Sequence, residues 1–448
     1  MAKYTKIKRY CIFVFLFAFA MELLQFLHTE SWIKVKSICP STICSKHGLL
    51  LSWMGSNKSV THVLADEQAK QSHDIYHDRF HFVFPDLPRQ SVLPVSCPLL
   101  FAGNKTEQKR AMLFKRSLQT TSSIYYQEQV QNCTIFKQSY ITSYLTREEK
   151  EFPLAYSLLV YKDLMQVERL LRAIYRPQNV YCIHIDLTTA EDFRKTLSTI
   201  ADCFDNVFIT KRSVNVRWGT FTVLEPEILC MEELWKYKTW KYFINLTGQE
   251  FPLRTNGELV KILKIYNGTN DVAGTLKRAN VRRWAKAGTP PAGITPGKGG
   301  VHITVNRHFV DYILHNQTAQ AFLNWCRNTS VPDETFFASL NHNAHLGIPG
   351  SANGYVEPYI KNSRFKNWGT QPCAGRMVRS ICIFGIGDLP VLSKRKELFA
   401  NKFYMNYQTF TFDCMEELIY NRTKDGYFKK MDVNTTYYEN LQFLKNRI

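Results

Sequence analysis

The sequence predicts an α/β fold built on a mostly parallel sheet with Rossmann-like topology. Short, uninterrupted apolar runs, as expected of buried parallel strands, alternate with segments whose apolar residues recur at helical spacing. This alternation begins near Phe152 of the 448-residue chain. Strands that alternate with helices form parallel sheets, and such sheets bind ligands at the carboxyl ends of their strands.

The expected strands are short and bounded by polar or turn residues. They cover residues 154–161, 180–185, 207–209 and 240–246. Asp186 directly follows the second strand, so it is either a cap of the next turn or a ligand-binding group at the strand's carboxyl end.

Three helices are expected between these strands. The first has an apolar face at Leu164, Val167, Leu171 and Ile174, and Pro177 ends it. Thr189 is the expected N-cap of the second. The third runs from Pro226 to Trp235. Residues 285–300 contain so much Gly and Pro that we expect a loop there, and long loops inside domains often line a site.

Composition excludes several classes of protein. Hydrophobic residues make up 45% of the chain and aromatic residues 14%, which excludes a disordered protein. The net charge is +19, yet the Lys and Arg residues are spread along the chain, and the sequence contains no zinc finger, basic helix or aromatic RNA-binding motif. We therefore expect no nucleic-acid partner. Ordinary solvated surface explains most of the charge, and a basic cleft for an anionic ligand explains part of it.

Cysteines and glycosylation sequons indicate the secretory pathway. None of the twelve cysteines forms a Cys-x-x-Cys pair, so zinc is not expected. Asn-x-Ser/Thr sequons are more frequent than chance predicts, which together with the cysteines suggests glycans and disulfides. The sequons lie at Asn57, Asn104, Asn132, Asn245, Asn267, Asn316, Asn328, Asn421 and Asn434.

The N-terminus predicts a membrane anchor. Basic residues precede an apolar run over residues 10–27. Either this run is a signal peptide cleaved after Ala18-Phe19-Ala20, or it is an uncleaved signal anchor with a cytosolic basic end. Apolar residues continue past Ala20, which favours the anchor. The expected layout is a cytosolic tail (1–9), a transmembrane helix (10–27), a luminal stem (28–95) and a luminal domain (96–448) that carries the function.

Three motifs in the C-terminal half supply one carboxylate and two cations. They are Ser330-Val-Pro-Asp-Glu334, Cys373 and Cys382 flanking Arg379, and Phe399-Ala-Asn-Lys402-Phe403. Considered alone, Glu334 fits a helix start with a capping-box pattern, and the two cations fit solvated surface. The chain contains no Asp-x-Asp, the usual metal–diphosphate clamp, and two fixed cations can replace a metal at a leaving diphosphate.

These motifs resemble the core-2/I-branching β-1,6-N-acetylglucosaminyltransferases, glycosyltransferase family 14. The resemblance covers residues 97–414 and includes Arg172–Asp186 and Trp240–Pro252. It implies a GT-A-like domain with flanking helices in a type II Golgi membrane protein. The implied reaction is inverting, metal-independent transfer of N-acetylglucosamine from UDP-GlcNAc to a 6-hydroxyl of galactose or N-acetylgalactosamine in O-glycans.

The resemblance also implies roles for individual residues. Glu334 is the catalytic base, Arg379 and Lys402 hold the donor diphosphate, and Asp186 contacts the nucleotide. The acceptor side departs from the family pattern, because Val272, Asn280 and His302 stand where the family has Glu, Lys and Tyr. The expected acceptor residues are Arg283, which is kept, and Trp284 and Trp368, whose rings can stack on a sugar.

Four disulfides are implied by the same resemblance: Cys97–Cys414, Cys133–Cys203, Cys182–Cys230 and Cys373–Cys382. Cys39 and Cys44 are left in the stem, where one can link two chains into a homodimer. Cys326, beside Trp325, is expected to be a buried thiol.

Two alternatives stay open. The donor can be another UDP-hexose, or the enzyme can transfer xylose to a peptide serine. A catalytically silent, membrane-tethered glycan-binding protein is the alternative from another class. The intact Glu334, Arg379 and Lys402 argue against it, because a lectin needs no diphosphate site.

Overall fold

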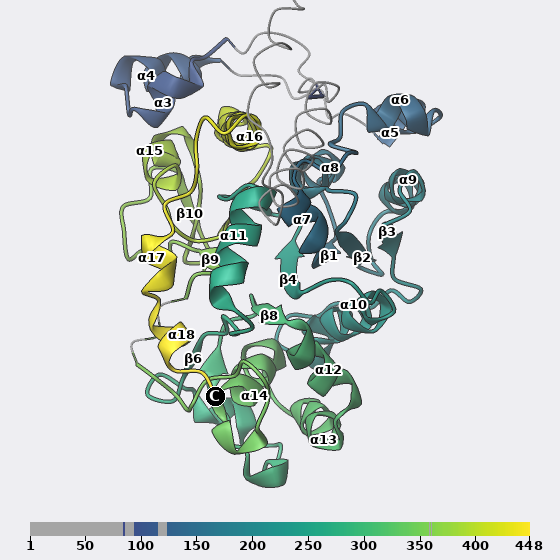
Figure 1. Ribbon diagram of the computed structural model, residues 1–448, viewed down its shortest axis with the longest axis vertical. Coiled ribbons are helices and arrows are strands. Elements are labelled where there is room, and N and C mark those ends of the chain that lie inside the picture. Colours follow the sequence, from purple (N-terminus) through teal and green to yellow (C-terminus); the bar gives the residue numbers. More distant parts are fainter. Residues whose placement is uncertain (1–83, 86–93, 115–122, 358, 360) are drawn as a thin grey trace, which may run out of the picture. The chain divides into compact units, whose positions relative to one another are not determined.

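The computed structural model describes residues 84–85, 94–114, 123–357, 359 and 361–448 (Figure 1). The expected tail, the transmembrane helix and nearly all of the stem, with Cys39 and Cys44, lie outside this part. Within it, no helix is both long enough and apolar enough to cross a membrane.

The central sheet has the parallel strands expected from the sequence. They are β1 (Leu154–Val160), β2 (Val180–Ile185), β3 (Val207–Ile209) and β4 (Tyr242–Thr247). The order is β3-β2-β1-β4-β8, with β8 (Thr304–Asn306) antiparallel to β4. This mixed α/β arrangement with a parallel-rich sheet fits a GT-A-like fold.

Helices cover both faces of this sheet. Tyr156 and Leu158 of β1 belong to the core that includes α8 (Leu164–Ile174) and α9 (Glu191–Asp202), whereas Ala155 belongs to the core with α10 (Glu225–Trp235). The expected cap of α9 is wrong: Ala190 stands at the N-cap, and the Thr189 hydroxyl donates to the Tyr161 carbonyl at 3.4 Å instead.

Three small sheets surround the central one. The first has the order β5-β12-β9, from β5 (Glu250–Pro252), β12 (Phe399–Asn401) and β9 (Arg364–Phe365). β10 (Arg376–Val378) and β11 (Ile381–Ile383) form a hairpin. β6 (Gly274–Thr275) pairs with β7 (Lys298–Gly299). The region 285–300 is otherwise irregular apart from the 3₁₀ turn η3 (Pro291–Gly293).

The remaining helices complete the described part of the chain. The α-helices are α3 (Cys97–Phe101), α4 (Lys105–Leu113), α5 (Ser123–Gln129), α6 (Cys133–Lys137), α7 (Arg147–Glu151), α11 (Asn256–Tyr266), α12 (Arg307–His315), α13 (Gln317–Cys326), α14 (Phe336–His342), α15 (Leu389–Leu392), α16 (Phe410–Tyr427), α17 (Thr436–Glu439) and α18 (Gln442–Lys445). The 3₁₀ turns besides η3 are η1 (Phe221–Val223), η2 (Val281–Trp284), η4 (Pro332–Glu334), η5 (Ala344–Leu346) and η6 (Ile386–Asp388).

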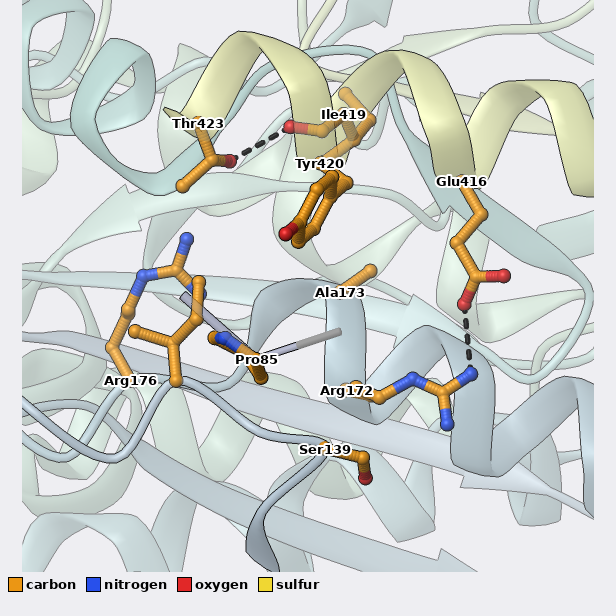
Figure 2. A pocket seen from close by; sticks show the side chains of 10 residues that line it. Pro85, Ser139, Arg172, Ala173, Arg176, Glu416, Ile419, Tyr420 and Thr423 are labelled. Atoms are coloured by element: carbon orange, nitrogen blue, oxygen red, sulfur yellow. Dashed lines mark hydrogen bonds and ion pairs between the residues drawn. The ribbon is translucent and has the colours of Figure 1, made fainter. Parts of the chain in front are cut away.

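A buried ion-pair network joins α8 to α16. Arg169 contacts Asp413 at 2.8 Å and Glu416 at 2.5 Å, and Arg172 contacts Glu416 at 2.8 Å. Figure 2 shows Arg172 and Glu416 in the wall of a small cavity between these two helices. None of the residues expected to bind donor or acceptor lines this cavity, so the network serves the packing of the fold.

Three of the four expected cysteine pairs are bonded. They are Cys97–Cys414, Cys133–Cys203 and Cys373–Cys382. The fourth is not, because Cys182 and Cys230 are free, buried thiols. The Cys230 sulfur lies 3.5 Å from the carbonyl oxygen of Cys182, as a thiol donor, and both side chains pack as small apolar groups in the α10 core. Cys326 is a free, buried thiol, as expected.

We expect the long-range bridge to contribute most to stability. The Cys97–Cys414 bridge spans 317 positions and the Cys373–Cys382 bridge spans nine. If each restricts the unfolded chain, replacing the first pair by alanines lowers the free energy of unfolding by about 3 kcal/mol more than replacing the second. Urea unfolding of the two double variants measures this difference, and equal losses would contradict it.

Candidate functional site

Glu334 lies in a 3₁₀ turn rather than in a capped helix. The N-cap position of η4 is Val331, which has a positive φ of 53° and provides no side-chain cap. Ser330 is exposed, and within the described part of the chain Asp333 Oδ1 has no hydrogen-bond partner. The capping-box interpretation is therefore wrong, which removes the main structural explanation for an acidic residue here.

Three contacts fasten η2 to this turn. The Arg283 guanidinium forms an ion pair with Glu334, with 2.6 Å between Nη1 and Oε2. The Ser330 amide donates to the Arg283 carbonyl at 2.9 Å, and the Trp284 indole donates to the Thr335 hydroxyl at 3.0 Å. Arg283 and Trp284 are thus neighbours of Glu334. The Glu334 side chain is 31% exposed, so a ligand can reach it.

The local charges around Glu334 include a second carboxyl group. Asp333 is buried, and burial, together with the negative charge of Glu334, raises the pKa of Asp333 to about 6. Asn280, at the position where the family has a lysine, accepts a hydrogen bond from the Arg282 amide and caps η2. The departure at this position therefore has a structural role.

Asp186 closes a turn and also holds a neighbouring segment. Its Oδ1 accepts hydrogen bonds from the amide and hydroxyl of Thr188, and its Oδ2 accepts one from the Val216 amide at 2.8 Å. Burial alone would raise the pKa of this carboxyl, but these hydrogen bonds outweigh it and the pKa is lowered. Asp186 is therefore ionised and positioned at the carboxyl end of β2.

The segment from Val214 to Gly219 connects Asp186 with the turn that carries Glu334. The Val214 amide donates to His184, whose pKa burial lowers to about 4, so the ring is neutral and accepts. At the other end the Val331 amide donates to the Gly219 carbonyl at 2.9 Å. Trp218 in this segment is 85% exposed. Sequence reasoning missed Trp218, and its only signal was an aromatic residue in a polar loop after a strand.

Arg379 occupies the tip of the β10–β11 hairpin. Arg379 and Ser380 both have positive φ, 49° and 64°, as a tight hairpin turn requires, although neither residue is the Gly or Asn that adopts this conformation readily. The Cys373–Cys382 bridge holds the base of the hairpin. Strain of this kind persists where the surrounding structure enforces it and is concentrated at functional sites.

Lys402 lies near an aromatic ring that a second lysine also approaches. It follows β12, and its Nζ is 5.7 Å from the ring of Tyr404. The Nζ of Lys162, which follows β1, lies 4.5 Å from the same ring. Sequence reasoning missed Lys162, which could have been found as a cation after the carboxyl end of a parallel strand.

The structure does not bring Arg379 and Lys402 into contact. The Lys402 carbonyl accepts a hydrogen bond from the Phe384 amide, five residues beyond Arg379 and roughly 17 Å of extended chain away. Trp368 precedes both residues in the sequence and is 51% exposed. It follows Asn367, whose carbonyl accepts a hydrogen bond from the Cys382 amide. Arg379 and Lys402 are therefore carried by separate segments, the hairpin tip and the end of β12.

Among the described residues, one group of side chains is compact enough to hold a metal ion: Cys373, Cys382 and Asp388. Its two sulfurs are bonded to each other, so they are not free to ligate an ion. Chemically, the region provides an accessible carboxylate that can accept a proton and separate cations that can offset negative charge.

Comparison with known proteins gives consistent matches. Residues 154–393 match the family model described as Core-2/I-Branching enzyme. The chain is 32% identical to the β-1,3-galactosyl-O-glycosyl-glycoprotein β-1,6-N-acetylglucosaminyltransferase of Homo sapiens, over 72% of this chain and 84% of that protein. It is 33% identical to the N-acetyllactosaminide β-1,6-N-acetylglucosaminyl-transferase of Homo sapiens, over 75% of this chain and 87% of that protein.

Proposed function

Because this chain belongs to the core-2/I-branching enzyme family, we propose that it transfers N-acetylglucosamine from UDP-GlcNAc to a 6-hydroxyl of galactose or N-acetylgalactosamine in O-glycans. The observation that carries the proposal is the accessible Glu334 carboxylate, held by Arg283 in a turn that has no side-chain cap. The matched relatives carry β-1,6-N-acetylglucosaminyltransferase activity in their names, which supports the same donor and linkage.

In the proposed reaction, Glu334 removes the proton from the acceptor hydroxyl as its oxygen attacks the anomeric carbon. The bond between that carbon and the diphosphate breaks on the opposite face, so the configuration inverts. Arg379 and Lys402 offset the charge that develops on the departing UDP, and no metal takes part. Arg283 orients the base, and Trp284 and Trp368 offer faces for the acceptor sugar.

The proposed setting is the Golgi membrane, with a single N-terminal anchor and the catalytic domain in the lumen. The three cysteine pairs are compatible with an oxidising lumen. Asn245 is a sequon that we exclude from glycosylation, because its side chain is buried and its amide donates to Glu227 and to the Val301 carbonyl. A disulfide-linked homodimer through a stem cysteine is part of the same proposal.

The deciding experiment is a donor and acceptor screen. Purified full-length chain is incubated with UDP-GlcNAc, other UDP-hexoses or UDP-xylose and with O-glycan or peptide acceptors, and UDP release and the product linkage are measured. We expect release only with UDP-GlcNAc and a β-1,6-linked product. Formation of a xylosylated peptide would favour transfer of xylose from UDP-xylose. Glycan binding without UDP release would favour a lectin.

We expect Asp186→Asn to raise the KM for the donor by about tenfold, with a smaller effect on kcat. The amide can still accept from Thr188, but its NH₂ group faces the Val216 amide, so the segment that carries Trp218 loses its anchor. Steady-state kinetics at saturating acceptor measures the change. Asp192→Asn, on the exposed start of α9, is the matched control. An unchanged donor KM would remove Asp186 from the donor site.

A further inference from the structure

The three-stranded sheet β5-β12-β9 places a second lysine, Lys366, at the end of the sheet where Lys402 lies. β9 and β12 run parallel, so Lys366 and Lys402, which follow them, leave the sheet at the same edge. β5 is antiparallel to β12, and its first residue, Glu250, stands opposite Asn401 at this edge. The Nζ of Lys366 lies 5.9 Å from the ring of Trp368. Lys366 is therefore a neighbour of the expected acceptor tryptophan.

The carboxylate at this end of the sheet, Glu250, already forms an ion pair. Glu250 contacts Arg364 at 2.6 Å through Oε2, and its Oε1 lies 2.5 Å from His302 and 3.0 Å from the Asn401 amide. Within the described part of the chain Lys366 has neither an ion pair nor a hydrogen-bond partner, although it is only partly exposed. Glu250 and Glu334 attract Lys366, but each already forms an ion pair with an arginine. A ligand that brings its own negative charge would therefore stabilise this half-buried ammonium further.

Several cations interact electrostatically with Glu334. Arg283 already pairs with Glu334. Lys361 and Arg278 are exposed and also have no ion pair among the described residues. Although the Lys361 residue is exposed, its ammonium is shielded from part of the solvent, and this shielding, with the positive charge of Arg278, lowers its pKa. Asp271, Glu397 and Glu334 act on Lys361 in the opposite direction, as Glu334 does on Lys366. These cations therefore share one electrostatic environment with the base.

We propose that the natural acceptor is an anionic glycan whose carboxylate or sulfate ester is bound by Lys366, with Lys361 and Arg278 forming the rest of the positive surface. This inference rests on the proposed transferase function and narrows its substrate class. The acceptor, rather than the donor, is assigned to Lys366 because its Nζ lies 5.9 Å from the ring of Trp368, which offers an adjacent face for a sugar.

The test compares neutral and anionic acceptors with the purified full-length chain. The acceptors are a β-1,3-galactosyl disaccharide, the same disaccharide with a sialic acid carboxylate, and the same disaccharide with a sulfate ester, each with its 6-hydroxyl free. We expect the wild-type chain to have a higher kcat/KM with an anionic acceptor than with the neutral one. Comparison of the sialylated with the sulfated acceptor identifies whether the carboxylate or the sulfate ester is recognised.

We expect Lys366→Gln to lower the ratio of anionic to neutral kcat/KM by about 10- to 100-fold, because a charge-assisted hydrogen bond is lost. Lys366→Arg should retain most of the ratio. Lys195→Gln removes the same charge from an exposed position on α9 and should leave the ratio unchanged. Thermal unfolding of each variant separates loss of recognition from loss of folding.

The preference for the anionic acceptor can also be measured as a function of pH. This dependence would not involve Lys366 if the residue had only a structural role. Burial, with the positive charge of Lys361 adding to it, lowers the pKa of Lys366 to about 8, so the ammonium is present below that pH and is lost above it. The wild-type preference for the anionic acceptor should therefore decline as the pH rises through 8, whereas Lys366→Arg should keep it. The charged groups that act on Lys366 or are acted on by it are Glu250, His302, Asp333, Glu334, Lys361 and Arg364.

Three results would overturn the proposal. The first is a wild-type chain that uses neutral and anionic acceptors equally well. The second is a Lys366→Gln variant whose donor KM rises while the acceptor ratio stays constant, which would place Lys366 on the diphosphate. The third is absence of UDP release with every acceptor. This result would contradict the proposed transferase function and, with it, the proposed acceptor class.

Discussion

Glu334→Gln is expected to lower kcat by about 10²–10⁴-fold while the affinity for UDP-GlcNAc is nearly kept. The amide has the shape of the carboxylate but cannot accept the proton of the acceptor hydroxyl. Its carbonyl oxygen can still accept from Arg283, so the contact between η2 and η4 survives and the free energy of unfolding should change little. Initial rates at saturating donor and acceptor, with UDP binding measured separately, test this.

The matched control for the base is Glu232→Gln, which removes an exposed carboxylate from α10. This variant should turn over like the wild type. Wild-type turnover in Glu334→Gln would disprove the assignment of the base. A large fall in unfolding temperature would instead return Glu334 to a structural role, which the absence of a cap in its turn argues against.

Arg379→Ala and Lys402→Ala are each expected to lower kcat/KM for the donor by about 10²–10³-fold, since each removes a cation that offsets charge on the leaving diphosphate. Arg379→Lys should remain poor, because an ammonium cannot bind two phosphate oxygens in a fork. The effects should shrink as salt rises, because part of each interaction is charge on charge. Arg376→Ala, in the same hairpin with its side chain over the Tyr407 ring, is the control.

Removal of metal ions tests independently whether Arg379 and Lys402 replace a metal at the diphosphate. Transfer by the wild-type chain should proceed undiminished in excess EDTA, and manganese should add nothing. If EDTA abolishes transfer and manganese restores it, an ion and not the pair Arg379 and Lys402 neutralises the diphosphate. The roles of both residues would then have to be reassigned.

The sequence predicted the parallel core well because local patterns determine it. Each of the four apolar runs became a strand within two residues of the expected ends, since a strand buried on both faces needs such a run and tolerates little else. Helix α8 buried the expected face. The three-stranded sheet β5-β12-β9 was not predicted, because its strands are only two or three residues long and pair with partners far away in the sequence, as Phe399 does with Pro252 and with Arg364.

The site was predictable as a set of residues but not as an arrangement. Arg283 and Trp284 lie against the Glu334 turn as neighbours, yet the capping box proposed for that turn is absent because Val331 adopts a left-handed conformation that its sequence does not signal. Trp218, Lys162 and Lys366 were missed for a common reason. Their positions depend on which loops meet across the fold, and single residues of these types are ordinary in any surface loop.

The bridge between Cys97 and Cys414 has a consequence for biosynthesis. A ribosome adds about 5–20 residues per second, so the 317 positions between the two cysteines keep Cys97 without its partner for roughly 15–60 s. During this interval seven other cysteines emerge as competing thiols: Cys133, Cys182, Cys203, Cys230, Cys326, Cys373 and Cys382. A wrong bond made by Cys97 must be reopened by thiol–disulfide exchange before α3 can be joined to α16. Correct oxidation, which takes seconds to hours, therefore sets the pace of maturation rather than the microsecond formation of its helices.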